Sequence, residues 1–313
     1  MLLAWCGNIA WGQCCSGGVP IAGNLSLPAG GNKVLQLQLT YDYNRLRDLF
    51  NENQNLQDQT RQRSTHSSLL EISYGLDSNW SIAGLFAHVA QERIIETIPG
   101  RRDYTLTQGL GDFVLLIRRT IIDRQDYGWS IGIGPKIPTG SNERREEDGS
   151  WVSADLQPGS GAWDLMFWSS FSAYHLLKEN LSFNLMLTGR MTSSADRLDG
   201  LQQYEFGNEW QVFAGLSDRY VSGRWIIDPL LMFRYRVVSP DLVNDFPLSN
   251  TGGQFIHFVP GMVLSPHPKI SFRISSELPI FRYVDGTQLA TSQKLTVGLF
   301  FRLAPQSSIG FSN

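Results

Sequence analysis

Few residues of this sequence stand at the spacings that enzyme chemistry requires. His66 comes two residues before Ser68, so both side chains share one face if the segment is extended. A serine nucleophile needs an adjacent base and a third group that orients the base. The pair supplies the nucleophile and the base, so a phospholipase-like hydrolase is one functional hypothesis; it ranks third, after the two that are given below.

Other catalytic and metal-binding patterns are missing from the chain. It has no HExxH, P-loop or GxGxxG motif. It also has no CxxC pair, and the remaining histidines are scattered, at His88, His175, His257 and His267. We therefore predict that the protein is not an enzyme and that it holds no metal or cofactor.

Charged side chains form a second set with chemical potential, because they alternate with apolar residues. Lys136 and Asp164 flank one long polar segment, and the others fall in later apolar stretches. Charges of both signs around a common interior steer a solute or pair to stiffen the wall. We predict that six of them line a solute path: Lys136, Asp164, Arg234, Arg236, Arg273 and Glu277. The alternative is that most of them only pair with each other.

The elements that must position these charges are strands. From Lys33 onward, apolar and polar residues alternate, as in Leu35, Leu37 and Leu39 against Gln36, Gln38 and Thr40. A period of two is typical of a strand between an apolar and a polar environment. The pattern recurs and predicts about twelve strands of roughly nine to fourteen residues, long enough for a tilted strand to cross a bilayer. Aromatic residues gather near the predicted strand ends, as at a lipid-water interface.

The connections between these strands alternate in length. Short turns fall near 77–79, 123–126, 178–180, 217–223 and 266–268, and longer polar segments fall near 45–66, 92–107, 140–161, 192–202, 238–252 and 282–290. Outer-membrane barrels combine short periplasmic turns with long extracellular loops. We therefore predict an all-β fold, a single transmembrane antiparallel up-and-down β-barrel with both termini in the periplasm. A soluble β-sandwich would not sort its loops by length.

Composition excludes several other classes. The chain has 313 residues, a net charge of −3, and is 42% hydrophobic and 18% charged. A nucleic-acid binder usually has a basic excess, and the absence of any apolar run of about 20 residues excludes a helical membrane protein. Residues 1–13 resemble a partial signal peptide, with a small-x-small site at Ala10-Trp11-Gly12. The predicted divisions are the signal peptide (1–13), a periplasmic lead-in (14–32), the barrel (33–304) and a tail (305–313).

Two motif sets resemble known proteins. The last predicted strand carries Thr296-x-Gly298-x-x-Phe301-x-Leu303, which resembles the signal read by the outer-membrane assembly machinery. Three stretches, Gly109-Leu110-Gly111-Asp112, Pro135 to Gly140 and Leu156 to Gly161 with Asp164, together resemble the outer-membrane transporter-like family named after the meta-pathway of phenol degradation. This resemblance implies an outer-membrane barrel that passes small, often hydrophobic or aromatic, compounds.

The sequence thus predicts a channel in the Gram-negative outer membrane for passive or facilitated uptake of small molecules. Its expected partners are the lipid bilayer, lipopolysaccharide, the assembly machinery and a small-molecule solute, with no nucleic acid. The alternative is a closed structural or adhesive barrel whose loops bind outside partners, since barrels of intermediate size lie between filled and open.

Overall fold

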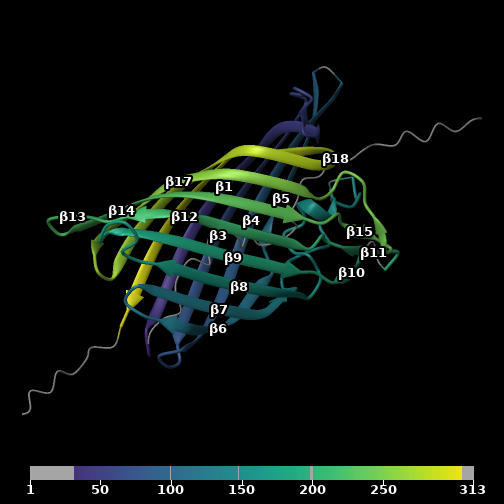
Figure 1. The fold of residues 1–313 in the computed structure, drawn as a ribbon. Coiled ribbons are helices and arrows are strands. Elements are labelled where there is room, and N and C mark those ends of the chain that lie inside the picture. Colours follow the sequence, from purple (N-terminus) through teal and green to yellow (C-terminus); the bar gives the residue numbers. More distant parts are fainter. Residues whose placement is uncertain (1–31, 99, 147, 198–199, 305–313) are drawn as a thin grey trace, which may run out of the picture.

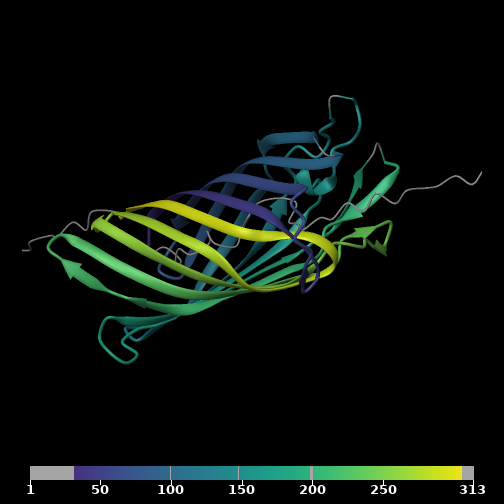
Figure 2. The ribbon, with the colours of Figure 1, turned by 90° about the horizontal axis from the view of Figure 1, so that it is seen from above.

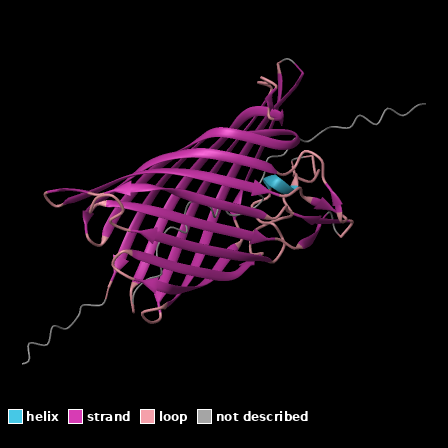
Figure 3. Cartoon of the chain, in the orientation of Figure 1, coloured by secondary structure: helices cyan, strands magenta, loops and turns pink. Residues whose placement is uncertain are grey.

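The computed structural model describes residues 32–98, 100–146, 148–197 and 200–304. The predicted signal peptide, all but the last residue of the lead-in, and the tail at 305–313 lie outside the described residues. Within these ranges the one helical element is a 3₁₀ turn at Ala154–Leu156 (Figure 3). None of the described helices is long and apolar enough to cross a membrane.

The described chain closes into an antiparallel ring of eleven strands with extra strands attached (Figure 1). The ring order is β12-β9-β8-β7-β6-β4-β3-β1-β18-β17-β14, and pairing of β14 with β12 closes it. The all-β antiparallel barrel predicted from the sequence is therefore confirmed. The ring strands are β1 (Leu35–Glu52), β3 (Arg61–Gly75), β4 (Trp80–Ile98), β6 (Phe113–Asp123), β7 (Tyr127–Ile137), β8 (Asp164–Ala173), β9 (Leu181–Met191), β12 (Glu209–Asp218), β14 (Trp225–Val238), β17 (Gly253–His267) and β18 (Ile270–Leu303).

The extra strands fall into two groups. Three pair with ring strands, namely β2 (Gln54–Asn55), β5 (Arg101–Leu110) and β13 (Tyr220–Ser222). Four make a small separate sheet, namely β10 (Ser194–Arg197), β11 (Gln202–Glu205), β15 (Leu242–Val243) and β16 (Phe246–Pro247). Figure 2 shows this small sheet standing at one end of the barrel.

β18 supplies two neighbouring positions in the wall. Its first arm, 270–284, pairs with β17, and its second arm, 287–303, pairs with β1. The reversal passes through Gly286, whose φ of 79° favours glycine. The segment 282–290 was predicted as a long loop, and that prediction was wrong because the hairpin continues as strand through its tip.

Two further segments predicted as loops are mostly strand. β1 and β3 extend through much of 45–66, and β4 and β5 through most of 92–107. Apolar and polar residues do not alternate regularly in these segments, so they lack the pattern that marks a strand. The protein therefore carries long hairpins at one end of the barrel, and short turns at the other.

Alternation places polar side chains inside the ring and apolar ones outside. Along β1, Gln36 and Gln38 are buried, whereas Leu39 and Tyr41 are 52% and 42% exposed. The pattern is the reverse of a soluble protein, in which apolar side chains are buried. It gives the barrel a broad apolar outer surface.

The interior is filled rather than open along one side. An apolar cluster inside the ring draws on β3, β4, β6, β8, β9 and β12, and its members are Leu69, Ala83, Leu85, Ala87, Val89, Val114, Leu116, Met166, Trp168, Met186 and Phe213. The remaining wall, from β14 through β17 and β18 to β1, carries many buried charged residues. Buried charges also lie beside the apolar cluster, since Glu71 of β3 and Arg118 of β6 are buried inside the ring.

Candidate functional site

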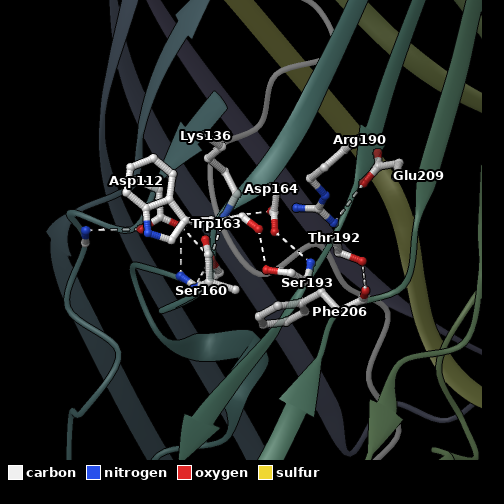
Figure 4. Close-up of polar contacts among 12 residues, drawn as sticks. Asp112, Lys136, Ser160, Trp163, Asp164, Arg190, Thr192, Ser193, Phe206 and Glu209 are labelled. Atoms are coloured by element: carbon white, nitrogen blue, oxygen red, sulfur yellow. Dashed lines mark hydrogen bonds and ion pairs between the residues drawn. The ribbon is translucent and has the colours of Figure 1, made fainter. Parts of the chain in front are cut away.

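Lys136 occupies the middle of a fully buried polar cluster at the end of β7 (Figure 4). Its Nζ lies 2.7 Å from Asp112 Oδ2 and 2.8 Å from Asp164 Oδ2, and it also donates to the Ser160 hydroxyl. The ammonium group therefore donates hydrogen bonds to Asp112 and Ser160 and forms an ion pair with Asp164. We call these four residues the Lys136 centre.

The Lys136 centre joins the three stretches that carried the family resemblance. Asp112 also accepts hydrogen bonds from the backbone N–H groups of Gly140, at 3.1 Å, and Ser160, at 2.9 Å. Gly140 and Gly159 touch so closely that a Cβ on Gly159 would lie 2.5 Å from the Gly140 carbonyl. Both ends of the segment 138–163 are therefore fastened to each other and to the barrel wall. We call this segment the inner loop.

Ionisation of Asp112 follows from these contacts. Burial raises the pKa of this carboxyl, but the Lys136 ammonium and the hydrogen bonds from Lys136 and Ser160 lower it by more. The net effect is a pKa below the ordinary value for aspartate. Asp112 is therefore a carboxylate at neutral pH, as an ion pair requires.

A second set of charged residues forms a belt inside the barrel, with members from six of the seven consecutive wall positions between β1 and β9, all but β17. Lys294 lies 3.6 Å from Asp42 and 3.1 Å from Glu277, and Glu277 contacts Arg234. Beyond Arg234 the belt continues through Gln211 to Glu209. The members of this charge belt are Asp42, Thr296, Lys294, Glu277, Arg234, Gln211, Glu209, Arg236 and Arg190.

The six residues predicted to line a solute path thus divide between two places. Lys136 and Asp164 pair in the Lys136 centre, and neither reaches solvent to more than 6%. Arg234, Arg236 and Glu277 belong to the charge belt. Arg273 is half-buried on the face of β18 that also carries Glu277. Whether a solute touches these side chains stays a prediction.

The sequence reasoning missed important members of the belt. Lys294 links two carboxylates that lie on different strands, and Gln211 bridges Arg234, at 2.9 Å, to Glu209, at 2.5 Å. Their position opposite the apolar face of their strands is the signal that marks them as inward. Their partners depend on the register between strands, which alternation does not contain.

Above the inner loop, at the end with the long hairpins, lies a vestibule of about 1650 Å³. Its walls include β3, β4 and β5, the inner loop and the small four-stranded sheet. Arginines Arg61, Arg63, Arg93, Arg102 and Arg197 line it, together with carboxylates and with apolar residues such as Leu46, Leu248 and Leu289. The vestibule is thus a cavity with charged and apolar walls.

The small sheet is tied to the inner loop and to the barrel. Arg197 donates to the Ser160 carbonyl at 2.9 Å, and Asp241 accepts from the Tyr204 hydroxyl at 2.5 Å and from the Gly207 N–H at 2.7 Å. Burial raises the pKa of Asp241 above its ordinary value, although these hydrogen bonds oppose it. The small sheet is therefore bonded to the inner loop on this side of the vestibule.

The two serine patterns of the chain lie on strands. His66 and Ser68 are on the outward face of β3, and His66 Nδ1 is 2.7 Å from the Tyr41 hydroxyl of β1. The run from Gly128 to Gly132 fits the letters GxSxG around Ser130, but it lies inside β7. A nucleophile elbow is a sharp strand-to-helix turn, so this run lacks the geometry of one. The described residues include no group of three or more His, Cys, Asp or Glu that could hold a metal ion.

Comparison with solved structures identifies the fold. The chain is similar to an outer-membrane channel from Pseudomonas putida F1, with a TM-score of 0.70 and 11% identity, over 91% of this chain and 100% of that one. It is also similar to the β domain of the Bordetella autotransporter Brka, with a TM-score of 0.50 and 12% identity, over 87% of this chain and 100% of that one.

No protein-family model and no curated protein sequence matches the chain. The fold is that of outer-membrane β-barrels, and identities this low show the fold alone. The resemblance to the family named after the meta-pathway of phenol degradation stays a prediction.

Proposed function

We propose that the protein is a channel of the Gram-negative outer membrane through which small molecules, including hydrophobic or aromatic ones, cross passively or by facilitated diffusion. The observation that carries the proposal is the inverted wall, with apolar side chains exposed outside and charged ones buried inside. A closed ring leaves no unpaired strand edge in lipid. The structural similarity to a protein described as an outer-membrane channel supports the same function.

The proposed barrel crosses the membrane twelve times. Antiparallel neighbours around a closed ring require an even number of passes, and the two arms of β18 raise eleven strands to that number. Leu35 and Leu303 end the wall beside each other on the side of the short turns. In the proposed orientation this side faces the periplasm, the long hairpins face outward among lipopolysaccharide, and the assembly machinery inserts the barrel.

The proposed path begins in the vestibule and continues past the charge belt. The inner loop stands between the two, fastened by the Lys136 centre. Because the inner loop stands in this path, passage requires the loop to move. Movement of this loop is therefore the proposed gating step.

Solute flux into proteoliposomes tests the proposal. Folded protein in vesicles should admit a small sugar such as arabinose faster than empty vesicles or vesicles with heat-unfolded protein. A variant with a loosened inner loop, Lys136→Met, should admit it faster still. Correctly folded protein that passes no small solute, in either form, would refute a channel.

One observation favours a second candidate, the closed structural or adhesive barrel. Arg118 is fully buried inside the ring, where it pairs with Glu71 at 2.6 Å and lies 4.9 Å from the Trp168 ring centre. Such packing fills a lumen. If the folded barrel is impermeable and its long hairpins bind an outside partner, the second candidate replaces the channel.

We also propose that the protein has no enzyme activity. Ser68 and His66 share the outward face of β3, so the substrate of a hydrolase at this place would be a membrane lipid. Lipid hydrolysis by the wild-type protein that disappears in Ser68→Ala would overturn the proposal.

A further inference from the structure

Two arginines face each other across neighbouring strands in the wall of the vestibule. Arg63 of β3 is in register with Arg93 of β4, and both line the cavity. Like charges directly opposite each other destabilise a sheet. The pair therefore needs negative charge close by.

The inner loop supplies this charge in the present conformation. Asp155 Oδ2 lies 2.6 Å from Arg63 Nη1, and the Asp155 carbonyl accepts from Arg63 Nη2 at 2.6 Å. Glu146 Oε1 lies 3.4 Å from Arg93 Nη2, and the Ser153 hydroxyl lies 3.1 Å from Arg93 Nη1. Two carboxylates of the loop thus occupy positions at an arginine pair that belongs to the barrel.

This occupation leaves polar atoms unused. Arg63 is 7% exposed, yet its Nε–H has no partner, and Asp155 Oδ1 also has none. A buried donor without an acceptor costs free energy. The arginine pair can therefore take an anion that fits it more completely than the loop does.

The surroundings of the pair are apolar on one side. Leu46 of β1 is in register with Arg63, and Leu46, Leu248 and Leu289 line the same vestibule. A ligand with a single anionic group and an apolar body could contact the arginine pair with the first and the leucines with the second. Planar carboxylates match the forked donors of arginine.

We propose that Arg63 and Arg93 form the recognition site for amphipathic monocarboxylates, and that the carboxylate of the solute takes the places of Asp155 and Glu146. The exchange breaks the ties that hold the middle of the inner loop to the wall, so binding favours the open loop. The inference rests on the proposed channel function and names the solute class that this channel admits.

Competing uptake of two solutes in proteoliposomes tests the site, with benzoate as the anionic amphipath and arabinose as the uncharged reference. The double variant Arg63→Gln with Arg93→Gln should lower benzoate uptake about tenfold or more, because charged hydrogen bonds are lost. Arabinose uptake should not fall. The double variant Asp155→Asn with Glu146→Gln should raise the uptake of both solutes, because the loop no longer competes.

Arg101→Gln is the matched control, since Arg101 is 75% exposed on its side chain at the tip of the same hairpin and does not line the vestibule. If the double arginine variant fails to fold, Trp151 of the inner loop, over which Arg145 stacks at 3.9 Å, gives a second measurement on otherwise unaltered protein. Benzoate should change the wild-type fluorescence, and Trp151→Phe should remove that change.

The outcomes separate the two claims. Arabinose flux with benzoate uptake that is insensitive to Arg63 and Arg93, or without a fluorescence response, overturns the site and leaves the channel standing. Absence of flux for both solutes through folded wild-type protein refutes the channel itself.

Discussion

Replacing Lys136 by Met tests whether the Lys136 centre holds the inner loop in place. Met has nearly the same length but no charge, so the change removes the cation and leaves Asp112 and Asp164 facing each other. We expect the inner loop to detach from the wall while the strands around it stay paired. The ends of the loop, near Gly140 and Ser160, lose their shared attachment.

The magnitude follows from the two ion-pair distances. The carboxylate oxygens lie 2.7 Å and 2.8 Å from one nitrogen atom, so they are at most about 5.5 Å apart. Two like charges at that distance repel by about 3 kcal/mol at an effective dielectric constant of 20. Removing one partner of a buried pair costs about 3–5 kcal/mol in general, so both estimates agree. The opening equilibrium of the loop should shift by a factor of roughly 100 or more.

Limited proteolysis measures this shift, because trypsin cleaves after Arg144 and Arg145 of the inner loop. Lys136→Met should be cut there roughly 100-fold faster than the wild type if cleavage follows the open population. Lys178→Met is the matched control, since Lys178 pairs with Asp218 at an exposed turn, where ion pairs contribute about 0–1 kcal/mol. Equal cleavage rates for the two variants would contradict the reasoning.

The same centre predicts a dependence on pH. The folded pKa of Asp112 is lowered, so its contribution is complete above the unfolded value, about 4, and is lost as the pH falls through the lowered folded value. Cleavage of the wild-type loop by an acid protease should therefore rise only below about pH 4. In Lys136→Met this dependence should reverse, because protonation of one of the two facing carboxylates removes the repulsion that opens the loop. A wild-type loop that opens between pH 7 and 5 would show that other groups control it.

Three further substitutions test the fold. Gly159→Ala places a Cβ 2.5 Å from Gly140 and should cost about 1–3 kcal/mol, seen as faster cleavage of the inner loop; an unchanged rate would show that the chain crossing relaxes freely. Leu231→Arg, at a position 56% exposed on the outer face of β14, should cost about 2–4 kcal/mol in urea unfolding from vesicles, and no cost would argue against lipid contact there. Glu277→Gln leaves Arg234 and Lys294 without their shared anion and should lower the free energy of unfolding by about 3–5 kcal/mol. The control is Glu179→Gln, at an exposed position. Equal unfolding midpoints for the two variants would show that the belt is not stabilising.

Local patterns were enough to predict the faces of the strands. Gln36 and Gln38 point inward because the side-chain period of a strand is two, and that period is visible within a few residues. Hydropathy failed in the long hairpins, since water on both faces removes the contrast between them. It also hid the reversal at Gly286, where strand residues continue through the turn.

Pairing partners could not be predicted in the same way. Asp42 and Lys294 meet although 252 positions separate them in the sequence, because their contact depends on how the strands shift around the ring. Asp155 reaches Arg63 through the course of a long loop, which no periodicity describes. The letters GxSxG around Ser130 show that a local pattern can occur without the strand-to-helix turn that gives it catalytic meaning.

The seam between β1 and β18 has a consequence for how the protein is made. It runs from the pair Leu35 and Leu303 to the pair Glu52 and Val284. One edge of the first strand, β1, therefore stays unpaired until the last strand, β18, has been made. No part of the chain can close into a ring before the last strand is in place. The loss of conformational entropy on pairing such distant segments therefore falls on a single late step of folding. Removal of even one arm of β18 should therefore leave an open sheet with two unpaired strand edges rather than a smaller barrel.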